Sequence, residues 1–363
     1  MLPGVHLLAF AFVGLTTVCA GTAKKLIVDT DFFSDVDDVG ALLLACTLPG
    51  VDLLAVNINY PSTYSALAVS SVLGHYGHPH VPIGLAGPYS DTTYLDDFYY
   101  EHGEYASKVA YHWRNQSTLP WKDVSGTWDP TDLYRHVLSQ QPDKSVTIAS
   151  IGFLNNLSNL LNSSADEYSP LSGPELVAAK VGELVIMGGG YPSGHEFNFW
   201  GYDPAATRHV VNTWPGVMVF SGAELGENVY SGARFMVEAP SDDPTAAAYT
   251  CGYNNSRYSW DPLTVLYALE GKGGIFKFGN DGGYNYVYPN GTNVWRNSTG
   301  PYPQHYLRLA VSHTTAGKRL DELYLRGAVM FSASNTGRCK NASLGLSAKD
   351  DSPAFPAWTF SDA

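Results

Sequence analysis

The sequence predicts an α/β protein with an open, mostly parallel sheet and helices on both of its faces. Apolar runs of strand length alternate with helix-length patterns, and the strand runs end in Gly, Asn or Asp. This order implies parallel strands joined by crossover helices. Such Rossmann-like sheets bind ligands beyond the carboxyl ends of their strands, so functional residues are expected there.

The strand candidates are continuous and rich in β-branched residues. They occupy 25–31, 51–59, 81–87, 145–152, 183–190 and 216–222. Helix candidates lie between them at 36–48, 64–77, 130–141, 153–163 and 203–214. Later come a helix at 261–271, a hairpin at 283–295 with an Asn-Gly turn, and a helix at 318–329. Because no Pro/Gly-rich linker interrupts this order, we expect a single domain over residues 21–363.

The first twenty residues have the features of a signal peptide. Their apolar stretch ends in Val18-Cys19-Ala20, which suits a signal peptidase, although no Lys or Arg precedes it. Its core of about 12 residues is too short to cross a hydrocarbon layer that needs roughly 20. We therefore expect residues 1–20 to be removed and the mature protein to be secreted, with no membrane-spanning segment.

Secretion predicts glycosylation and an oxidising environment. Sequons begin at Asn115, Asn156, Asn162, Asn254, Asn290, Asn297 and Asn341. Asn156 lies in a leucine-spaced helix pattern, where a buried or capping role is favoured over a glycan. Cys251 with Cys339 is the expected disulfide, because Cys46 belongs to an apolar helix pattern. The absence of CxxC spacing argues against a zinc site.

The charge balance disfavours nucleic acid as a partner. The chain has 34 acidic and 21 basic residues, and no basic cluster is longer than Lys24-Lys25. Polyanion binding needs a dominant basic stripe, so a small molecule is the expected partner, while a homo-oligomer stays open.

Aspartates are concentrated within residues 29–38. Asp29 and Asp31 end the first strand and Asp37 and Asp38 open the next helix, so their carboxylates should meet at one edge of the sheet. A helix N-terminus stabilises a nearby anion by only about 0.3–1 kcal/mol, which is too little for four unpaired carboxylates. Their repulsion would raise their pKa values unless a hard cation, Ca²⁺ or Mg²⁺, neutralised them. Helix capping by Asp35 or Asp37 is the simpler alternative.

The segment DTDFFSDVDDVGAL at 29–42 resembles the inosine-uridine-preferring nucleoside hydrolases. That family carries DTDPGxDDxxAL after its first strand and cleaves the N-glycosidic bond of ribonucleosides with a bound Ca²⁺. This chain has two residues more between the motifs, which is similar to a longer branch of the family. The DxDx(T/V) motif of haloacid dehalogenase-type phosphatases fits less well, because Phe33 stands where that motif has Thr or Val.

Further motifs follow in the family's order. VNINYPS at 56–62 resembles VAGN, ASIGFLNNL at 149–157 resembles ATGPLTNL, the segment 187–206 resembles MGG…EFNxxxDPEAA, and SWDPL at 259–263 resembles HDPL. The resemblance implies the nucleoside hydrolase fold and Ca²⁺ ligands at Asp31, Asp38, Asp261 and the carbonyl of Ile151. It also implies ribose ligands at Asp37, Asn59, Glu196 and Asn198.

The chemistry expected of these residues is hydrolytic. A ribosyl carbon leaving its base passes through an oxocarbenium-like state, which needs negative charge near the ring and an activated water. Ca²⁺ would lower the pKa of that water, and Asp31 could take its proton.

Two departures from the family pattern concern the base. Trp260 stands where the inosine-uridine branch has a histidine, and a tryptophan can stack on a base, for roughly 1–3 kcal/mol, but cannot protonate it. This is similar to the purine-specific branch, with Tyr253 and Tyr258 as further aromatic candidates. The segment before EFN lacks the family's asparagine, and His195 or Tyr191 stands in its place.

The alternative to a hydrolase is a secreted nucleoside- or sugar-binding protein that keeps the metal but turns over poorly. Asp31 discriminates between the two, because a pure binder would not need a base beside a metal-bound water. The sequence does not specify the preferred base, the oligomeric state or the role of residues 275–363.

Overall fold

The computed structural model describes residues 23–33, 35–91, 105–253 and 256–339. Its main strands are β1 Lys24–Thr30, β2 Val51–Ile58, β3 Ile83–Leu85, β4 Val146–Ser150, β5 Val181–Met187, β7 Met218–Ser221, β10 Phe276–Phe278 and β13 Gln304–Leu309. They form one eight-stranded sheet of order β10-β13-β7-β5-β4-β1-β2-β3. Neighbours are parallel except β10 and β13, so the predicted mostly parallel sheet is confirmed.

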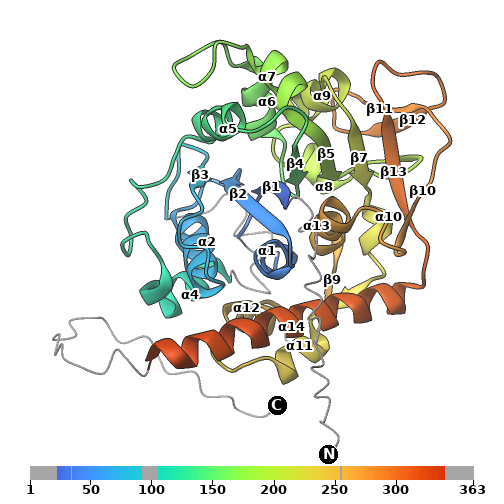
Figure 1. Cartoon of the computed structure of the whole chain (residues 1–363). Coiled ribbons are helices and arrows are strands. Elements are labelled where there is room, and N and C mark those ends of the chain that lie inside the picture. The colour runs from blue at the N-terminus through green and yellow to red at the C-terminus, as the bar shows by residue number, and fades with distance from the viewer. Residues whose placement is uncertain (1–22, 34, 92–104, 254–255, 340–363) are drawn as a thin grey trace, which may run out of the picture.

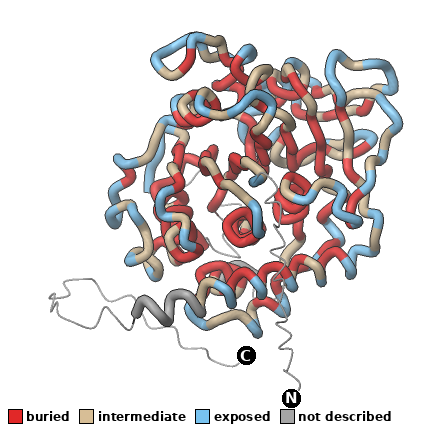
Figure 2. The backbone as a smooth tube through the Cα atoms, viewed as in Figure 1, coloured by how far each residue is buried: buried red, intermediate tan, exposed pale blue. Residues whose placement is uncertain are grey.

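The strands are buried on both faces because their side chains alternate between two cores. In β1, Leu26 and Val28 join one hydrophobic cluster, whereas Ile27 joins the other. In β5, Val185 packs into the first cluster and Leu184 into the second. Each such side chain contributes about 1.5–3 kcal/mol on burial. Figure 2 shows the buried residues concentrated in the sheet and the helices against it.

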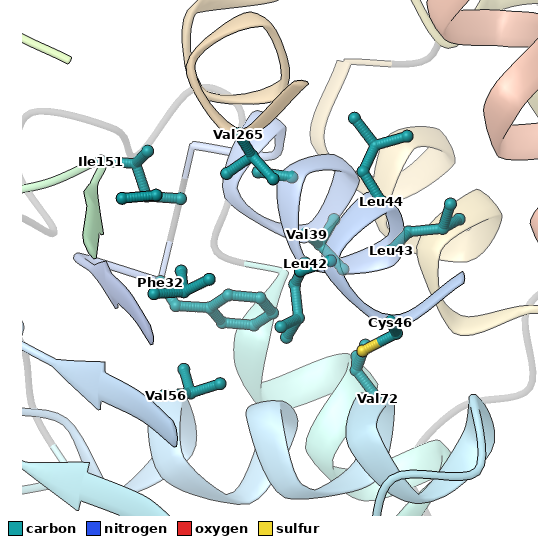
Figure 3. Packing of buried hydrophobic residues seen from close by; sticks show 14 of the residues in the cluster. Phe32, Val39, Leu42, Leu43, Leu44, Cys46, Val56, Val72, Ile151 and Val265 are labelled. Atoms are coloured by element: carbon teal, nitrogen blue, oxygen red, sulfur yellow. The ribbon is translucent and has the colours of Figure 1, made fainter. Parts of the chain in front are cut away.

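Helices cover both faces of the sheet (Figure 1). Those around the first cluster are α1 Asp37–Thr47, α2 Thr63–His75, α4 Ala106–His112, α10 Ala223–Gly226, α11 Ala233–Glu238, α12 Pro244–Tyr253, α13 Trp260–Glu270 and α14 His313–Cys339. Those around the second are α5 Pro130–Ser139, α6 Asn155–Asn162, α7 Gly173–Lys180, α8 Phe197–Trp200 and α9 Pro204–Thr213. Every residue of α1 is buried, and this helix packs against α13 and α14. Figure 3 shows that Phe32, from the loop before α1, packs in the same cluster as Leu42 of α1 and Val56 of β2.

Within the described residues, two small sheets lie outside the main one. The predicted hairpin is present as β11 Tyr284–Val287 and β12 Asn293–Arg296, with Gly291 in a positive-φ turn conformation. Its second strand also pairs with β6 Ser193–Gly194, which the sequence did not predict. The other small sheet joins β8 Tyr230–Ser231 to β9 Arg257–Tyr258.

Several expectations concern residues outside the described part of the chain. These are the signal peptide at 1–20, the sequons at Asn254 and Asn341, and the Cys251–Cys339 disulfide, whose side chains are not described. Cys46 is a buried free thiol. Asn156 is buried, as its helix pattern indicated, whereas the asparagines of the sequons at 115, 162, 290 and 297 are exposed. Among the helices within the described residues, none has the length and apolarity to cross a bilayer.

Strand order places a crevice beside β1. The chain leaves β1 through α1 to β2 on one side, but β4 pairs with β1 on the other side. At such a reversal the loops after neighbouring strands diverge, which opens a ligand site at their carboxyl ends.

Candidate active site

A pocket of about 390 Å³ opens at this crevice, beyond the ends of β1, β4, β5 and β7. The predicted residues that line it are Asp31, Asp37, Asp38, Ile151, His195, Glu196, Asn198, Trp260 and Asp261. The structure adds Asp35, Met187, Phe197, Trp200, Ala223 and Arg257. Its lining divides by chemistry into two groups of residues, the carboxylates, named here the acidic end, and the aromatic rings with Arg257 and His195, named the aromatic end.

The acidic end gathers side chains from two helix N-termini. Asp37 and Asp38 open α1, and Asp261 lies in the first turn of α13, which packs beside α1. All three are at most 5% exposed. The Thr30 hydroxyl donates to Asp38, and the Asp261 backbone N–H donates to Asp37 Oδ2 at 3.2 Å. Packing of α1 on α13 thus joins residues that are 223 positions apart or more in the sequence.

Burial and mutual repulsion disfavour the charged forms of these acids. Burial, with the carboxylates of Asp35 and Glu196 close by, raises the pKa of Asp31 to about 8. Burial and neighbouring carboxylates likewise hold the pKa values of Asp37, Asp38 and Asp261 well above their usual range. A bound cation would reverse this by stabilising the ionised forms.

The type of donor atom at this site suits a hard divalent cation. The donors are carboxylate oxygens, and Asp37 Oδ1 is buried without a hydrogen-bond partner. Within the described ranges, however, no three His, Cys, Asp or Glu side chains already stand in an arrangement that could hold a metal. The carboxylates would therefore have to close around an ion.

Asp35 behaves differently from the other acids, because Arg257 is its partner. Nε of Arg257 donates to Asp35 Oδ1 at 2.7 Å, and Nη2 donates to the other carboxylate oxygen. Burial raises the pKa of Asp35, but the Arg257 charge and hydrogen bonds outweigh it and the pKa falls below its usual value. Asp35 lies in the loop that exceeds the family pattern by two residues, so this longer loop carries an ion pair into the pocket wall.

Asn59 lies behind the pocket wall and not among the lining residues. It is fully buried, its Nδ2 donates to Asp29 Oδ1 at 2.6 Å, and its Oδ1 accepts from the Phe153 backbone N–H at 3.2 Å. Asp29 also accepts from the Tyr134 hydroxyl and from Asn156. Burial raises the pKa of Asp29 to about 7 despite these donors. Asn59 thus links the end of β1 to the loops after β2 and β4, and the contact with ribose that the resemblance implied stays a prediction.

Glu196 and Asn198 reach the pocket from the start of α8. Glu196 caps this helix: its Oε1 accepts from the Asn198 N–H at 2.8 Å and its Oε2 from the Gly189 N–H at 3.0 Å. Burial raises the pKa of Glu196 to about 7, although these backbone donors oppose the shift. Asn198 Nδ2 lies 3.1 Å from the sulfur of Met187.

The aromatic end is built around Trp260. Its indole N–H donates to the Ala223 carbonyl at 2.7 Å, and the Arg257 guanidinium lies 5.0 Å from its ring centre. The Tyr258 ring packs at 4.9 Å from the same ring. The sequence did not predict Arg257, four positions before Asp261 in RYSWD, as a pocket residue. Its pairing with Asp35 depends on a contact between distant segments that no local pattern encodes.

His195 also lines the pocket. Its ring stacks on Trp200 with centres 5.3 Å apart, and its Nε2 lies 3.2 Å from the Asn290 carbonyl. Tyr191, the other candidate for the missing asparagine, is buried and does not line the pocket. Of these two candidates, His195 is therefore the one that lines the pocket.

Comparisons with known proteins identify the family of this chain. The family described as inosine-uridine preferring nucleoside hydrolase matches residues 26–347. No curated protein matches the chain.

Solved structures share the fold at low sequence identity. The inosine-uridine preferring nucleoside hydrolase from Bacillus anthracis has 18% identity and a TM-score of 0.59, over 84% of this chain and 99% of its own. The purine-preferring ribonucleoside hydrolase from Gardnerella vaginalis has 15% identity and a TM-score of 0.59, over 85% and 99%. The type III effector protein XopQ, solved with adenosine diphosphate ribose, has 16% identity and a TM-score of 0.58, over 85% and 94%.

Proposed function

Because this chain belongs to the inosine-uridine preferring nucleoside hydrolase family, whose members are metal-dependent hydrolases of N-glycosyl bonds, we propose that it is a secreted, Ca²⁺-dependent ribonucleoside hydrolase that prefers purines. Its products would be ribose and the free base. The observation that carries this proposal is a single pocket that is lined by both a cluster of carboxylates and several aromatic rings.

The acidic end supports hydrolysis. Ca²⁺ bound by Asp31, Asp38, Asp261 and the Ile151 carbonyl would supply a Lewis acid that orients and acidifies the attacking water. Asp31 would accept the proton of that water in the proposed mechanism, because its carboxylate lines the pocket and the ion would keep it ionised.

The centre of the pocket supports ribose binding. Asp37, Glu196 and Asn198 present acceptors and donors for the ribose hydroxyls and would fix the sugar relative to the water. The negative charge of these acids also favours the positive charge that develops on the ring.

The aromatic end supports a preference for purines, since their larger π-face gains more from Trp260 and Trp200. One protein of the same fold carries the name purine-preferring. The apolar segment at 1–20 and the exposed sequons support secretion.

The test is ribose release by the purified protein from inosine, guanosine, adenosine, uridine and cytidine, with Ca²⁺ and with EDTA. We expect cleavage with Ca²⁺, fastest for the purine nucleosides, and loss of activity with EDTA. Binding of nucleosides without ribose release would contradict the proposal and leave a binding protein. Detection of the mature chain in the medium of expressing cells tests secretion separately.

A further inference from the structure

The hairpin of β11 and β12 contributes a buried asparagine to the loop before Glu196. Asn293 opens β12 and is fully buried. Its Oδ1 accepts from the Gly190 N–H at 2.9 Å, and its Nδ2 donates to the Gly190 carbonyl at 2.9 Å. Nδ2 also donates to Asn285 Oδ1 at 2.9 Å, across the hairpin. One amide side chain thus satisfies both backbone groups of a glycine in the loop, as a neighbouring strand would.

Asn293 holds this loop at both of its ends. Through its own backbone it pairs with Gly194, just before His195 and Glu196, while its side chain holds Gly190. The next residue back, Gly189, donates its N–H to Glu196 Oε2 and accepts from the Ala223 N–H at 2.9 Å. A short chain of contacts therefore runs from the hairpin to the carboxylate in the pocket.

The glycines of this loop make the approach possible. Gly189 has φ +73, and a Cβ there would lie 2.9 Å from Asn293 Oδ1. A Cβ on Gly194 would lie 2.7 Å from the Gly190 Cα. Since a side chain at either position would force Asn293 or the loop to move, the Gly-rich sequence before Glu196 is explained by docking of the hairpin.

We propose that Asn293 is a positioning residue that sets the Glu196 carboxylate for substrate binding. The inference rests on the proposed function in taking Glu196 as a ribose ligand. Glu196 has two acceptor oxygens, and one of them is bonded to the Gly189 N–H. The position of that oxygen therefore depends on the position of the 188–190 segment. Loss of the Asn293 amide removes both bonds to Gly190 and leaves those of Gly188 to Ser221 and of Gly189 to Ala223, so the segment loosens and the carboxylate loses part of its alignment with the sugar.

A matched pair of variants tests this. Asn293→Ala removes the bonds to Gly190. Asn212→Ala removes an equivalent pair on the same hairpin, where Asn212 bonds both the N–H and the carbonyl of Val287 at 3.0 Å but no group of the 188–196 loop. If the hairpin only stabilises the fold, both variants should lower the melting temperature and neither should change KM selectively.

We expect Asn293→Ala to raise KM for inosine about tenfold, since misplacement by an ångström can cost up to about a hundredfold. Asn212→Ala should stay within about twofold of wild type, because it alters no contact of Glu196. In a double mutant with Glu196→Gln, Asn293→Ala should add little, because the carboxylate through which it acts is already lost. Equal KM changes in both single variants, or effects that simply multiply in the double mutant, would overturn the inference.

Hydrogen exchange supplies a readout that needs no activity. Exchange of the backbone amides at 187–199 should accelerate in Asn293→Ala and not in Asn212→Ala. If wild type cleaves no nucleoside but exchange separates the variants in this way, the proposed function fails while the contact from Asn293 to the loop stands. Equal exchange in both variants overturns the positioning role itself. If Asn293→Ala does not fold, Asn293→Asp replaces it, since aspartate keeps the acceptor for Gly190 N–H and loses the donor to the Gly190 carbonyl.

Discussion

The two ends of the pocket are built in different ways. The acidic end comes mainly from one continuous segment, 29–38, where a strand ends and a helix begins, with Asp261 added by the packing of α13 on α1. The aromatic end combines Arg257 of β9 and Trp260 of α13 with His195 and Trp200, which lie just before α8 and at its end. The groups proposed to react thus come mainly from one local segment, whereas the groups proposed to recognise the base are brought together from two distant segments.

The largest effect that this contrast predicts is at the acidic end. Asp31→Asn should lower kcat by roughly 10³-fold or more, since it removes the proposed base and weakens a metal ligand. Asp38→Ala should be similarly severe because it removes a ligand. Asp35→Asn is the matched control, since Asp35 lines the same pocket but is paired with Arg257. Near-normal kcat in Asp31→Asn would show that the base lies elsewhere.

The sequence predicted the sheet and most of the helices because their apolar patterns are local. Runs such as 51–59 and 145–152 became β2 and β4 within a few residues. The carboxylates could be assigned to one edge because parallel strands present their carboxyl ends together. The resemblance then supplied Asp261 and Ile151, which no local rule joins to Asp31.

Other features could not be predicted, because long-range pairing decides them. Asn59 follows β2 as expected, but its side chain turns to Asp29, since that buried carboxylate needs donors. The pairing of β12 with β6 depends on contacts a hundred positions apart. The ion pair of Asp35 and Arg257 likewise joins residues that are 222 positions apart, so the sequence did not predict this pairing.

Metal binding should make the acidic end, but not the aromatic end, contribute to a Ca²⁺-dependent thermal stability. If Ca²⁺ binds only the native state, it should stabilise the protein by about 2.7 kcal/mol at a hundredfold excess over Kd. The melting temperature in Ca²⁺ should therefore exceed that in EDTA by several degrees. Asp38→Ala should lose this difference, whereas Trp260→Ala should keep it. No shift, with no metal found by elemental analysis, would contradict the metal site.

The aromatic end should give smaller, base-dependent effects. Trp260→Ala should lower kcat/KM for purine nucleosides by about 1–3 kcal/mol, or roughly ten- to a hundredfold. The effect on uridine should be smaller, and the affinity for Ca²⁺ should not change. Arg257→Lys separates stacking from charge, because lysine keeps the charge but loses the planar pairing with Asp35. A wild-type preference for uridine, or a Trp260→Ala variant equal to wild type on every nucleoside, would contradict stacking.

The smallest predicted effect is a pH dependence of kcat/KM that arises from Glu196. Glu196 has its pKa raised to about 7 by burial, so it is ionised above that pH and protonated below it. If the ionised carboxylate binds ribose, and saturating Ca²⁺ keeps Asp31 ionised, kcat/KM should fall as the pH falls, by about eightfold between pH 7.5 and pH 6. Glu196→Gln should flatten this acidic limb, and Asp203→Asn, at an exposed helix cap, should not.

Stability should change with pH in the opposite direction, which separates this effect from acid unfolding. A carboxyl group with a folded pKa of about 7 and an ordinary value of 4.5 binds more protons in the native state between these pH values. Its contribution to stability is therefore fully present below pH 4.5 and is lost as the pH rises through about 7. At pH 6 the activity should therefore be lower than at pH 7.5, while the contribution of Glu196 to stability should be larger. Thermal melts of wild type and Glu196→Gln at both pH values would measure that contribution. If activity and the Glu196-dependent stability instead decline together below pH 7, Glu196 is not the group that limits substrate binding.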